Sequence, residues 1–129
     1  MKETEMNNKL EFATKMQART KAFAVQVISF FGKLARTDEA RVLGRQLLRA
    51  GTSVAANYRA VCRAKSHADF ISKLGTVVEE ADESLLWLEL LEEAGICPAG
   101  QTAALKKEAD ELVRILQTSL NTAKCSAGR

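Results

Sequence analysis

Apolar residues recur at steps of three and four along four segments of the chain, the spacing of one face of an α-helix. The segments run over residues 9–36 and 39–64, from Ser66 to about residue 94, and from Pro98 to about residue 120. Short connections favour antiparallel neighbours. We therefore predict an all-α protein, an antiparallel up-down-up-down four-helix bundle over residues 9–123, with flexible ends at residues 1–8 and 124–129. The predicted core positions are Phe12, Met16, Phe23, Val27, Phe30 and Leu34; Leu43, Leu47, Ala50, Val54, Tyr58 and Val61; Phe70, Leu74, Val77, Ala81, Leu85 and Leu88; and Leu105, Ala109, Leu112, Leu116 and Leu120, with Val25, Ile28 and Phe31 widening the first stripe.

Residues that cap or stop helices stand at the predicted ends. Thr37 supplies an oxygen acceptor at the start of the second helix. Ser66 is followed three residues later by Asp69, the spacing of a capping box before the third helix. Gly95 suits a left-handed turn after the third helix, and Pro98 suits the first turn of the fourth.

The second helix carries arginines directly behind its apolar stripe. With Leu43 at zero on a helical wheel, they lie at roughly 160° to 240°. Such a stripe could follow a phosphate backbone. Each neutralised phosphate would then add roughly one unit to the slope of log affinity against log salt concentration. Alternatively it is a solvated face, or it pairs with Glu79, Glu83 or Glu93 of another subunit. The only nearby aromatic residue, Tyr58, is on the core side, so contact with the backbone or shape of a nucleic acid is favoured over base stacking. The candidate nucleic-acid-binding residues are Arg41, Arg45, Arg49, Arg59 and Arg63.

Composition and charge agree with this picture. The 129 residues suffice for one domain, and 5% aromatic residues with one proline are typical of a helical protein. The net charge is only +3, but residues 1–65 hold thirteen Lys and Arg against five acids, and residues 66–129 hold six against eleven. A basic half of this kind either pairs with an acidic half between subunits or binds a polyanion. No apolar run approaches the roughly 20 residues of a membrane span, and no secretion signal is recognisable, so we predict a cytoplasmic protein without a membrane partner.

The third helix has more apolar surface than a bundle core needs. Leu86 and Leu90 point away from the core among Glu79 and Glu83, and Trp87 flanks them, as a core or subunit contact. The small residues 50–56 should also let another backbone approach the second helix closely. We therefore predict a homo-oligomer. Its predicted interface residues on the third helix are Glu79, Glu83, Leu86, Trp87 and Leu90.

Reactive residues do not converge on a catalytic or metal site. His67 and Cys62 are separated by the expected helix break, so we interpret His67 as a polar residue at a helix N-terminus. The odd number of cysteines, Cys62, Cys97 and Cys125, fits reduced thiols. Asn57 lies beside the core stripe, where we favour a bond between helices over a ligand-facing amide. We predict no catalytic residue, metal or cofactor.

Several of these residues together resemble a known family. The run 46–57, QLLRAGTSVAAN, followed by Arg63, Ser66, Asp69 and the run 80–91, EADESLLWLELL, is similar to the four-helix bundle proteins encoded within 23S rRNA intervening sequences. The similarity extends over about residues 23–96. Where many members have an Asn-Ile-Ala-Glu-Gly-like run, this chain has Asn-Tyr-Arg-Ala-Val at residues 57–61, which makes it more basic. The motif residues of unknown role are Gln46, Ser53, Asn57, Ser66 and Asp69.

The resemblance implies a cytoplasmic bacterial protein that assembles into a ring-like homo-oligomer, most simply a homopentamer. It also implies a distant relationship to the accessory variability proteins of diversity-generating retroelements, which bind nucleic acid and a reverse transcriptase. Two functions follow as hypotheses. The first is non-enzymatic binding of structured RNA or DNA, without sequence specificity, by the five candidate arginines of the second helix. The second is a scaffold that binds a protein partner, such as a reverse transcriptase, on its oligomeric surface.

Overall fold

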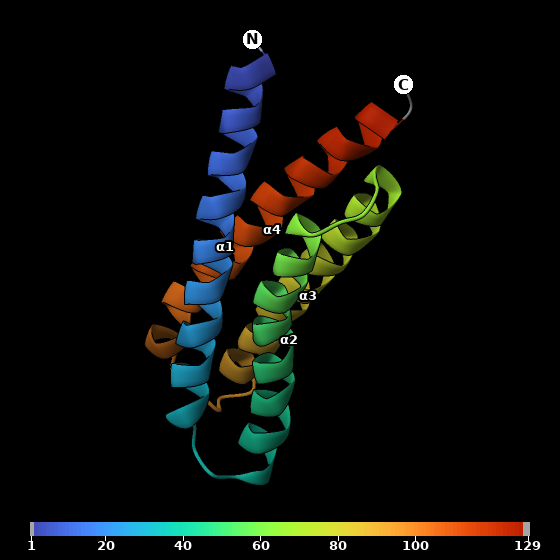
Figure 1. Ribbon diagram of the computed structural model, residues 1–129. Coiled ribbons are helices and arrows are strands. Elements are labelled where there is room, and N and C mark those ends of the chain that lie inside the picture. Colours follow the sequence, from blue (N-terminus) through green and yellow to red (C-terminus); the bar gives the residue numbers. More distant parts are fainter. Residues whose placement is uncertain (1, 128–129) are drawn as a thin grey trace.

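Four helices account for most of the chain in the computed structural model, which describes residues 2–127. They are α1 (Lys2–Gly32), α2 (Asp38–Cys62), α3 (His67–Glu93) and α4 (Ala99–Ala127), and they pack as a bundle (Figure 1). No strand occurs among the described residues. The prediction of an all-α bundle of four helices is therefore confirmed.

The core is formed by one stripe from each helix, largely as predicted from the spacing of apolar residues. Every predicted stripe residue of α4 is buried, and so are those of α2 except Leu43, which is half-buried. In α3, Phe70 and Leu85 are also only partly buried and pack against this core. Burial of these stripes is the main stabilising contribution to the bundle.

The predicted helix ends are confirmed in detail. Thr37 caps α2, its side chain accepting a bond from the amide of Ala40. The Ser66 side chain accepts a bond from the Asp69 amide at 3.0 Å, while the Asp69 carboxylate accepts one from the Lys65 amide, also at 3.0 Å. Gly95 has a φ of +74°, and the amide of Ile96 donates to the carbonyl of Leu91 at 3.0 Å, which closes the C-terminus of α3.

The first and last helices are longer at the chain ends than predicted. Residues 2–8 and 124–127, assigned above to flexible ends, are helical, and only residues 1 and 128–129 lie outside the described part of the chain. Acidic residues in the first turn of α1 favour its start. The start of α1 nevertheless extends beyond its neighbours: residues 2–12 are exposed, and Phe12, predicted in the core, is 41% exposed.

At its other end α1 stops earlier than predicted, at Gly32 rather than near residue 36. The amides of Lys33 and Leu34 bond to carbonyls three residues back, which tightens the last turn and ends the helix. Val25 and Ile28 were predicted to widen the apolar side of α1 toward the core. They are 59% and 52% exposed, because the other helices cover only part of the apolar surface of α1.

Two glycines of α2 bring α1 close. A Cβ atom added at Gly51 would lie 2.8 Å from Cγ2 of Val27, and one added at Gly44 would lie 2.7 Å from Cδ1 of Leu34. The predicted close approach of another backbone to the small residues 50–56 is therefore confirmed at Gly51. The approaching helix is α1 of the same chain, so Gly51 does not support the predicted oligomer.

Helices α1 and α4 contact each other much less than successive helices do, and they diverge toward the ends marked N and C (Figure 1). A cluster of ion pairs joins them. The Arg19 guanidinium donates to both carboxylate oxygens of Glu108, at 2.7 and 2.8 Å, and to Glu111 at 2.6 Å.

Within residues 2–127, no helix is long and apolar enough to cross a membrane.

Candidate nucleic-acid interface

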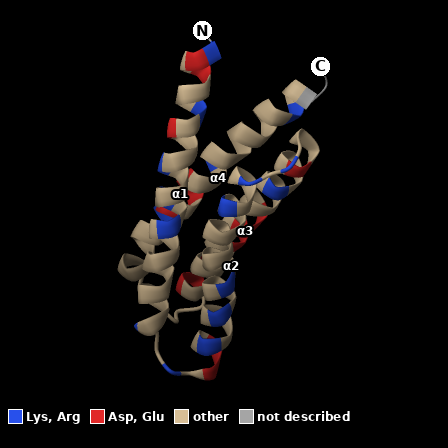
Figure 2. Cartoon of the chain, in the orientation of Figure 1, with Lys and Arg blue, Asp and Glu red and all other residues tan. Residues whose placement is uncertain are grey.

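All five arginines predicted to bind nucleic acid are exposed, four of them on α2 and Arg63 at its C-cap. Within residues 2–127 none of the four other than Arg49 forms an ion pair with an acidic side chain. Figure 2 shows basic residues along the lower part of α2 and at its upper end, separated by an uncharged stretch. We call these residues the arginine face: Arg41, Arg45, Arg59 and Arg63.

Arg49 differs from the other four because it is paired within the chain. One of its terminal nitrogens lies 3.3 Å from a carboxylate oxygen of Glu80, and the other is hydrogen bonded to Glu83. Partial desolvation lowers the pKa of Arg49, but charge attraction and hydrogen bonding to these two carboxylates together outweigh it and raise the pKa. Glu83, predicted to pair with an arginine of another subunit, is thus used within the molecule, whereas Glu79 is exposed. Ion pairs between exposed charges contribute little to stability. These two pairs nevertheless neutralise the charge of Arg49, so it is less available to a phosphate than the other four arginines.

Most of α1 and nearly all of α2 lack acidic residues. No Asp or Glu occurs over residues 12–37, most of α1 and the following turn, or over residues 40–68, which include nearly all of α2. The acids are instead concentrated on α3 and α4, where several pair with lysine or arginine. The exposed side of α1 and α2 therefore has a positive potential that would attract a polyanion.

A groove of about 310 Å³ lies between α1 and α2 beside the arginine face. Lys21 and Gln17 line it from α1, and Ala55, Ala56 and Arg59 line it from α2. The sequence analysis missed Lys21, because helical periodicity on a single helix does not reveal which residues of another helix lie beside Arg59.

The motif residues of unknown role have mainly structural contacts. Ser66 and Asp69 cap α3, and the Asp69 carboxylate also accepts a bond from Lys73, which lowers the pKa of Asp69. The Asn57 amide donates to the carbonyl of Ser53, one turn earlier in α2, at 2.9 Å. The predicted bond from Asn57 to another helix is therefore wrong, since a local carbonyl satisfies the amide. Gln46 is exposed.

The residues near the turn between α2 and α3 do not form a nucleophile and base. Nε2 of His67 lies 2.9 Å from the carbonyl oxygen of Ala123 in α4, and the ring stacks on Phe70 with centroids 6.3 Å apart. Cys62 is exposed, but partial desolvation of its thiol raises the pKa, which disfavours the reactive thiolate. His67 is the first residue of α3, as predicted, and its ring holds the end of α4 against α3.

A model of the 23S rRNA-intervening sequence protein family matches residues 12–118. The chain belongs to this family. The match contains the whole arginine face and the groove beside it. The resemblance inferred from the motifs is thereby confirmed, and it extends beyond residues 23–96 on both sides.

A crystal structure from Bacteroides thetaiotaomicron, of a protein with unknown function from the S23 ribosomal protein family, is similar to this family member. The two sequences are 30% identical, the structures superpose with a TM-score of 0.78, and the similarity covers 84% of this chain and 97% of that one. No curated protein is significantly similar to the chain. The more distant relationship to retroelement accessory proteins stays a prediction.

The matched region also contains the exposed leucines of α3. Leu86 and Leu90 are 46% and 37% exposed, as their position on the helical wheel predicted. Trp87 packs against the core while its ring N–H donates to a carboxylate oxygen of Glu83 at 3.3 Å. This is the first of the two contacts predicted for Trp87, and its place in a subunit interface stays a prediction. Whether the leucines form a subunit interface stays a prediction.

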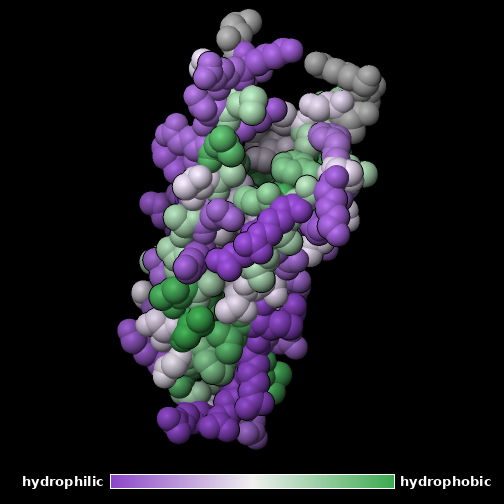
Figure 3. Space-filling model, in the orientation of Figure 1, coloured by the Kyte–Doolittle hydropathy of each residue, from purple (hydrophilic) through white to green (hydrophobic). Residues whose placement is uncertain are grey.

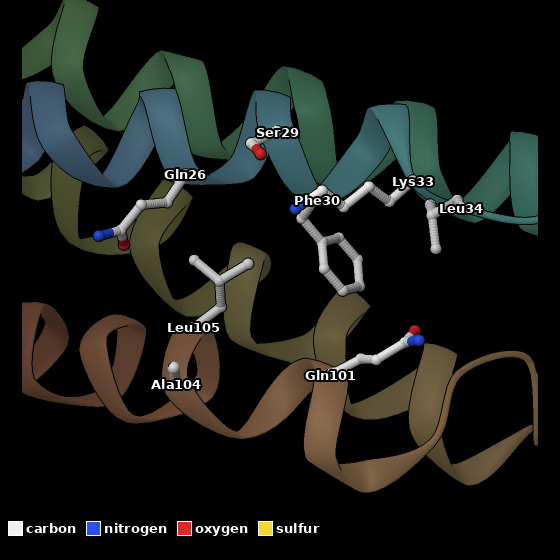
Figure 4. A pocket seen from close by; sticks show the side chains of 8 residues that line it. All are labelled: Gln26, Ser29, Phe30, Lys33, Leu34, Gln101, Ala104 and Leu105. Carbon is white, nitrogen blue, oxygen red and sulfur yellow. The ribbon is translucent and has the colours of Figure 1, made fainter.

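A second groove, of about 420 Å³, lies between the end of α1 and the beginning of α4 (Figure 4). Phe30 and Leu105 point into it from opposite helices, and Gln26, Lys33 and Gln101 supply polar groups at its edge. It contains no acid and no cluster of reactive side chains. Across residues 2–127, no group of His, Cys, Asp and Glu could hold a metal ion, and the three cysteines are unpaired.

Proposed function

We propose that this member of the 23S rRNA-intervening sequence protein family is a non-enzymatic, ring-forming homo-oligomer of up-down-up-down bundles that binds structured RNA or DNA. The binding surface is the arginine face of α2. The observation that carries this proposal is a set of four exposed arginines, three on α2 and one at its C-cap, that have no acidic partner among the described residues. The names of the family and of its similar crystal structure refer to ribosomal RNA and a ribosomal protein, which makes RNA the first ligand to test.

The spacing of the arginine face favours an extended, helical nucleic acid. Arg41 and Arg45 form one pair, Arg59 and Arg63 a second, and the midpoints of the pairs are about 27 Å apart along the helix axis at 1.5 Å per residue. This distance is somewhat less than one turn of a DNA duplex, about 34 Å. A double helix lying along α2 would therefore bring phosphate groups to both arginine pairs. A single free phosphate could contact only one of the two arginine pairs.

The contact would be made to the backbone rather than to base edges. Arginine pairs bidentately with phosphate oxygens, and the arginine face has no aromatic residue on which bases could stack. Contacts of this kind position a nucleic acid without reading its sequence. We therefore expect similar affinities for different sequences of one shape.

Two exposed apolar surfaces support the oligomer. Figure 3 shows hydrophobic side chains over the lower part of α1, beside a hydrophilic band along α2, and the exposed apolar residues of α1 include Val25 and Ile28. The second surface, with Leu86 and Leu90, belongs to α3. A ring of more than two subunits needs two different surfaces that join head to tail, and α1 and α3 provide two. Five subunits, as the family resemblance implies, is the number we propose.

The arginine face is tested by charge removal with a control on the same helix. The double variant Arg41→Gln, Arg45→Gln should weaken binding to a labelled RNA duplex in a fluorescence-anisotropy titration. It should also reduce the slope of log affinity against log salt by about two, because two phosphate contacts are lost.

Arg49→Gln is the matched control. It removes the same kind of charge one turn away, but from a side chain occupied by Glu80 and Glu83. Its effect on the salt slope should be small. Equal slopes for wild type and the double variant, with helicity and size unchanged, would reject the arginine face. Equal losses for Arg49→Gln and for each of Arg41→Gln and Arg45→Gln would show a general charge effect instead.

The exposed leucines of α3 favour a second candidate, a scaffold that binds a protein partner. Exposed leucines that cluster on one helix face commonly mark a protein contact. If they join subunits, Leu86→Ser with Leu90→Ser should dissociate the oligomer on a sizing column while the helicity of the chain is retained. If the oligomer persists, the leucines are free for a different partner, and a reverse transcriptase is the partner that the resemblance suggests.

A further inference from the structure

The groove between α1 and α2 has the composition of an anion site. Its volume of about 310 Å³ is at the lower end of the range for small-ligand sites. Lys21 and Arg59 bring one positive charge each from opposite sides, Gln17 adds a neutral amide donor, and no acid lines the groove.

The remaining lining residues make the groove accessible to a bulky anion. Ala55 and Ala56 contribute only methyl groups, and both are at least partly exposed. A larger side chain at either position would fill the space between the two cations. A tetrahedral group with attached atoms can therefore approach α2 closely at this point and still reach Lys21.

Neither cation is needed for an ion pair within the described residues. Three other basic residues on the same helices are occupied: Lys15 pairs with Glu11, Arg19 with Glu108, and Arg49 with Glu80 and Glu83. Lys21 and Arg59 have no such partner within residues 2–127. Two like charges facing one groove repel each other, and a bound anion would relieve that repulsion.

We propose that the groove binds one phosphate group, held by the Lys21 ammonium and the Arg59 guanidinium, with the Gln17 amide as a further donor. The proposal rests on the proposed function in one respect, that the phosphate belongs to a nucleic-acid backbone. It adds a residue of α1 to the binding surface, so the nucleic acid contacts two helices at this end of α2. A free phosphate or a nucleotide has the same chemistry, and the experiment below separates these sources.

The first test is Lys21→Gln in an anisotropy titration with a labelled RNA duplex of about 16 base pairs, the span that double-stranded RNA-binding domains contact. The affinity at low salt should fall about threefold to tenfold, and the salt slope should decrease by about one. Lys107→Gln is the matched control, because Lys107 is an exposed lysine of α4 without an ion pair in the described chain. Its salt slope should remain that of the wild type.

A second variant tests the groove without changing charge. Ala56→Leu fills the space at an exposed helical position, where leucine is well tolerated. It should weaken duplex binding while the far-UV circular dichroism spectrum stays the same. Wild-type affinity and salt slope in both Lys21→Gln and Ala56→Leu would overturn the phosphate groove and leave the arginine face standing.

An NMR titration of the protein with inorganic phosphate separates this inference from the proposed function. If the wild type binds no RNA even at low salt, the nucleic-acid function is rejected. Phosphate-dependent shifts of the Ala55 and Ala56 amides that disappear in Lys21→Gln would then still support the groove as a site for free phosphate or a nucleotide. Absence of such shifts together with absence of RNA binding would overturn it.

Discussion

Gly51→Ala should destabilise the protein, although alanine is the better helix former. The added Cβ would lie 2.8 and 2.9 Å from the two methyl carbons of Val27 and 3.1 Å from its Cβ. Carbon atoms in good contact are about 3.5 to 4.0 Å apart, so α1 and α2 would have to separate by about 0.7 Å. Val27 is fully buried and, as a β-branched residue in a helix, has essentially one rotamer, so it cannot turn away.

The magnitude is the difference between two opposing effects. Overpacking of a tight contact costs about 1–3 kcal/mol, and replacing glycine by alanine within a helix gains about 1 kcal/mol. We expect a net loss of about 1 kcal/mol for Gly51→Ala. At Gly44 the nearest atoms are the flexible tip of Leu34 at 2.7 Å and two ring carbons of Phe31 at 3.1 Å. Both side chains are only half-buried and can move, so Gly44→Ala should be neutral or stabilising by up to about 1 kcal/mol.

Urea unfolding followed by far-UV circular dichroism at one fixed protein concentration measures this difference. In a Val27→Ala background the penalty of Gly51→Ala should largely disappear, because the clashing methyl groups are absent, and the double-mutant cycle gives their coupling. The reasoning fails if Gly51→Ala is as stable as Gly44→Ala, or if its penalty persists without the Val27 methyls. Dissociation of the oligomer with no loss of chain stability would instead place Gly51 in a subunit interface.

Three further predictions concern polar contacts of the bundle. Arg19→Gln should lower the free energy of unfolding by about 1 kcal/mol, since Glu108 loses its partner, and an unchanged urea midpoint would show that these ion pairs do not stabilise the protein. Ser66→Ala should cost about 1 kcal/mol through loss of the α3 cap, and Ser66→Thr should largely restore the urea midpoint. A hydrogen bond from Lys106 lowers the pKa of Glu92 against opposing desolvation, so this contribution to stability is present above the ordinary pKa of 4.5 and is lost as the pH falls through the lower folded value. Thermal unfolding between neutral and acid pH should therefore show a flatter acid limb for Glu92→Gln, and parallel curves would contradict this.

Local signals in the sequence were sufficient for the helices and their ends. The cap at Ser66, the positive φ at Gly95 and the buried stripe of α4 depend on residues within a few positions of each other. A helix and its caps are determined by interactions of this short range. The predictions that failed at the ends of α1 concern exposed residues, where the presence or absence of a packing partner cannot be read from periodicity.

The candidate site was only partly predictable for the same reason. The wheel of α2 correctly placed its arginines opposite the core, because that depends on one helix alone. It could not separate Arg49 from Arg45, because the difference lies in Glu80 and Glu83 of α3.

The amino-acid sequence by itself determined that this protein is a helical bundle with a basic second helix, since periodicity, caps and charge are properties of neighbouring residues. Only the tertiary structure decided that α1, rather than another subunit, fills the space at Gly51. It also decided that Lys21 lies beside Arg59. These outcomes depend on the depth at which two helices pack and on their relative rotation, which are set by side-chain contacts between residues distant in the chain.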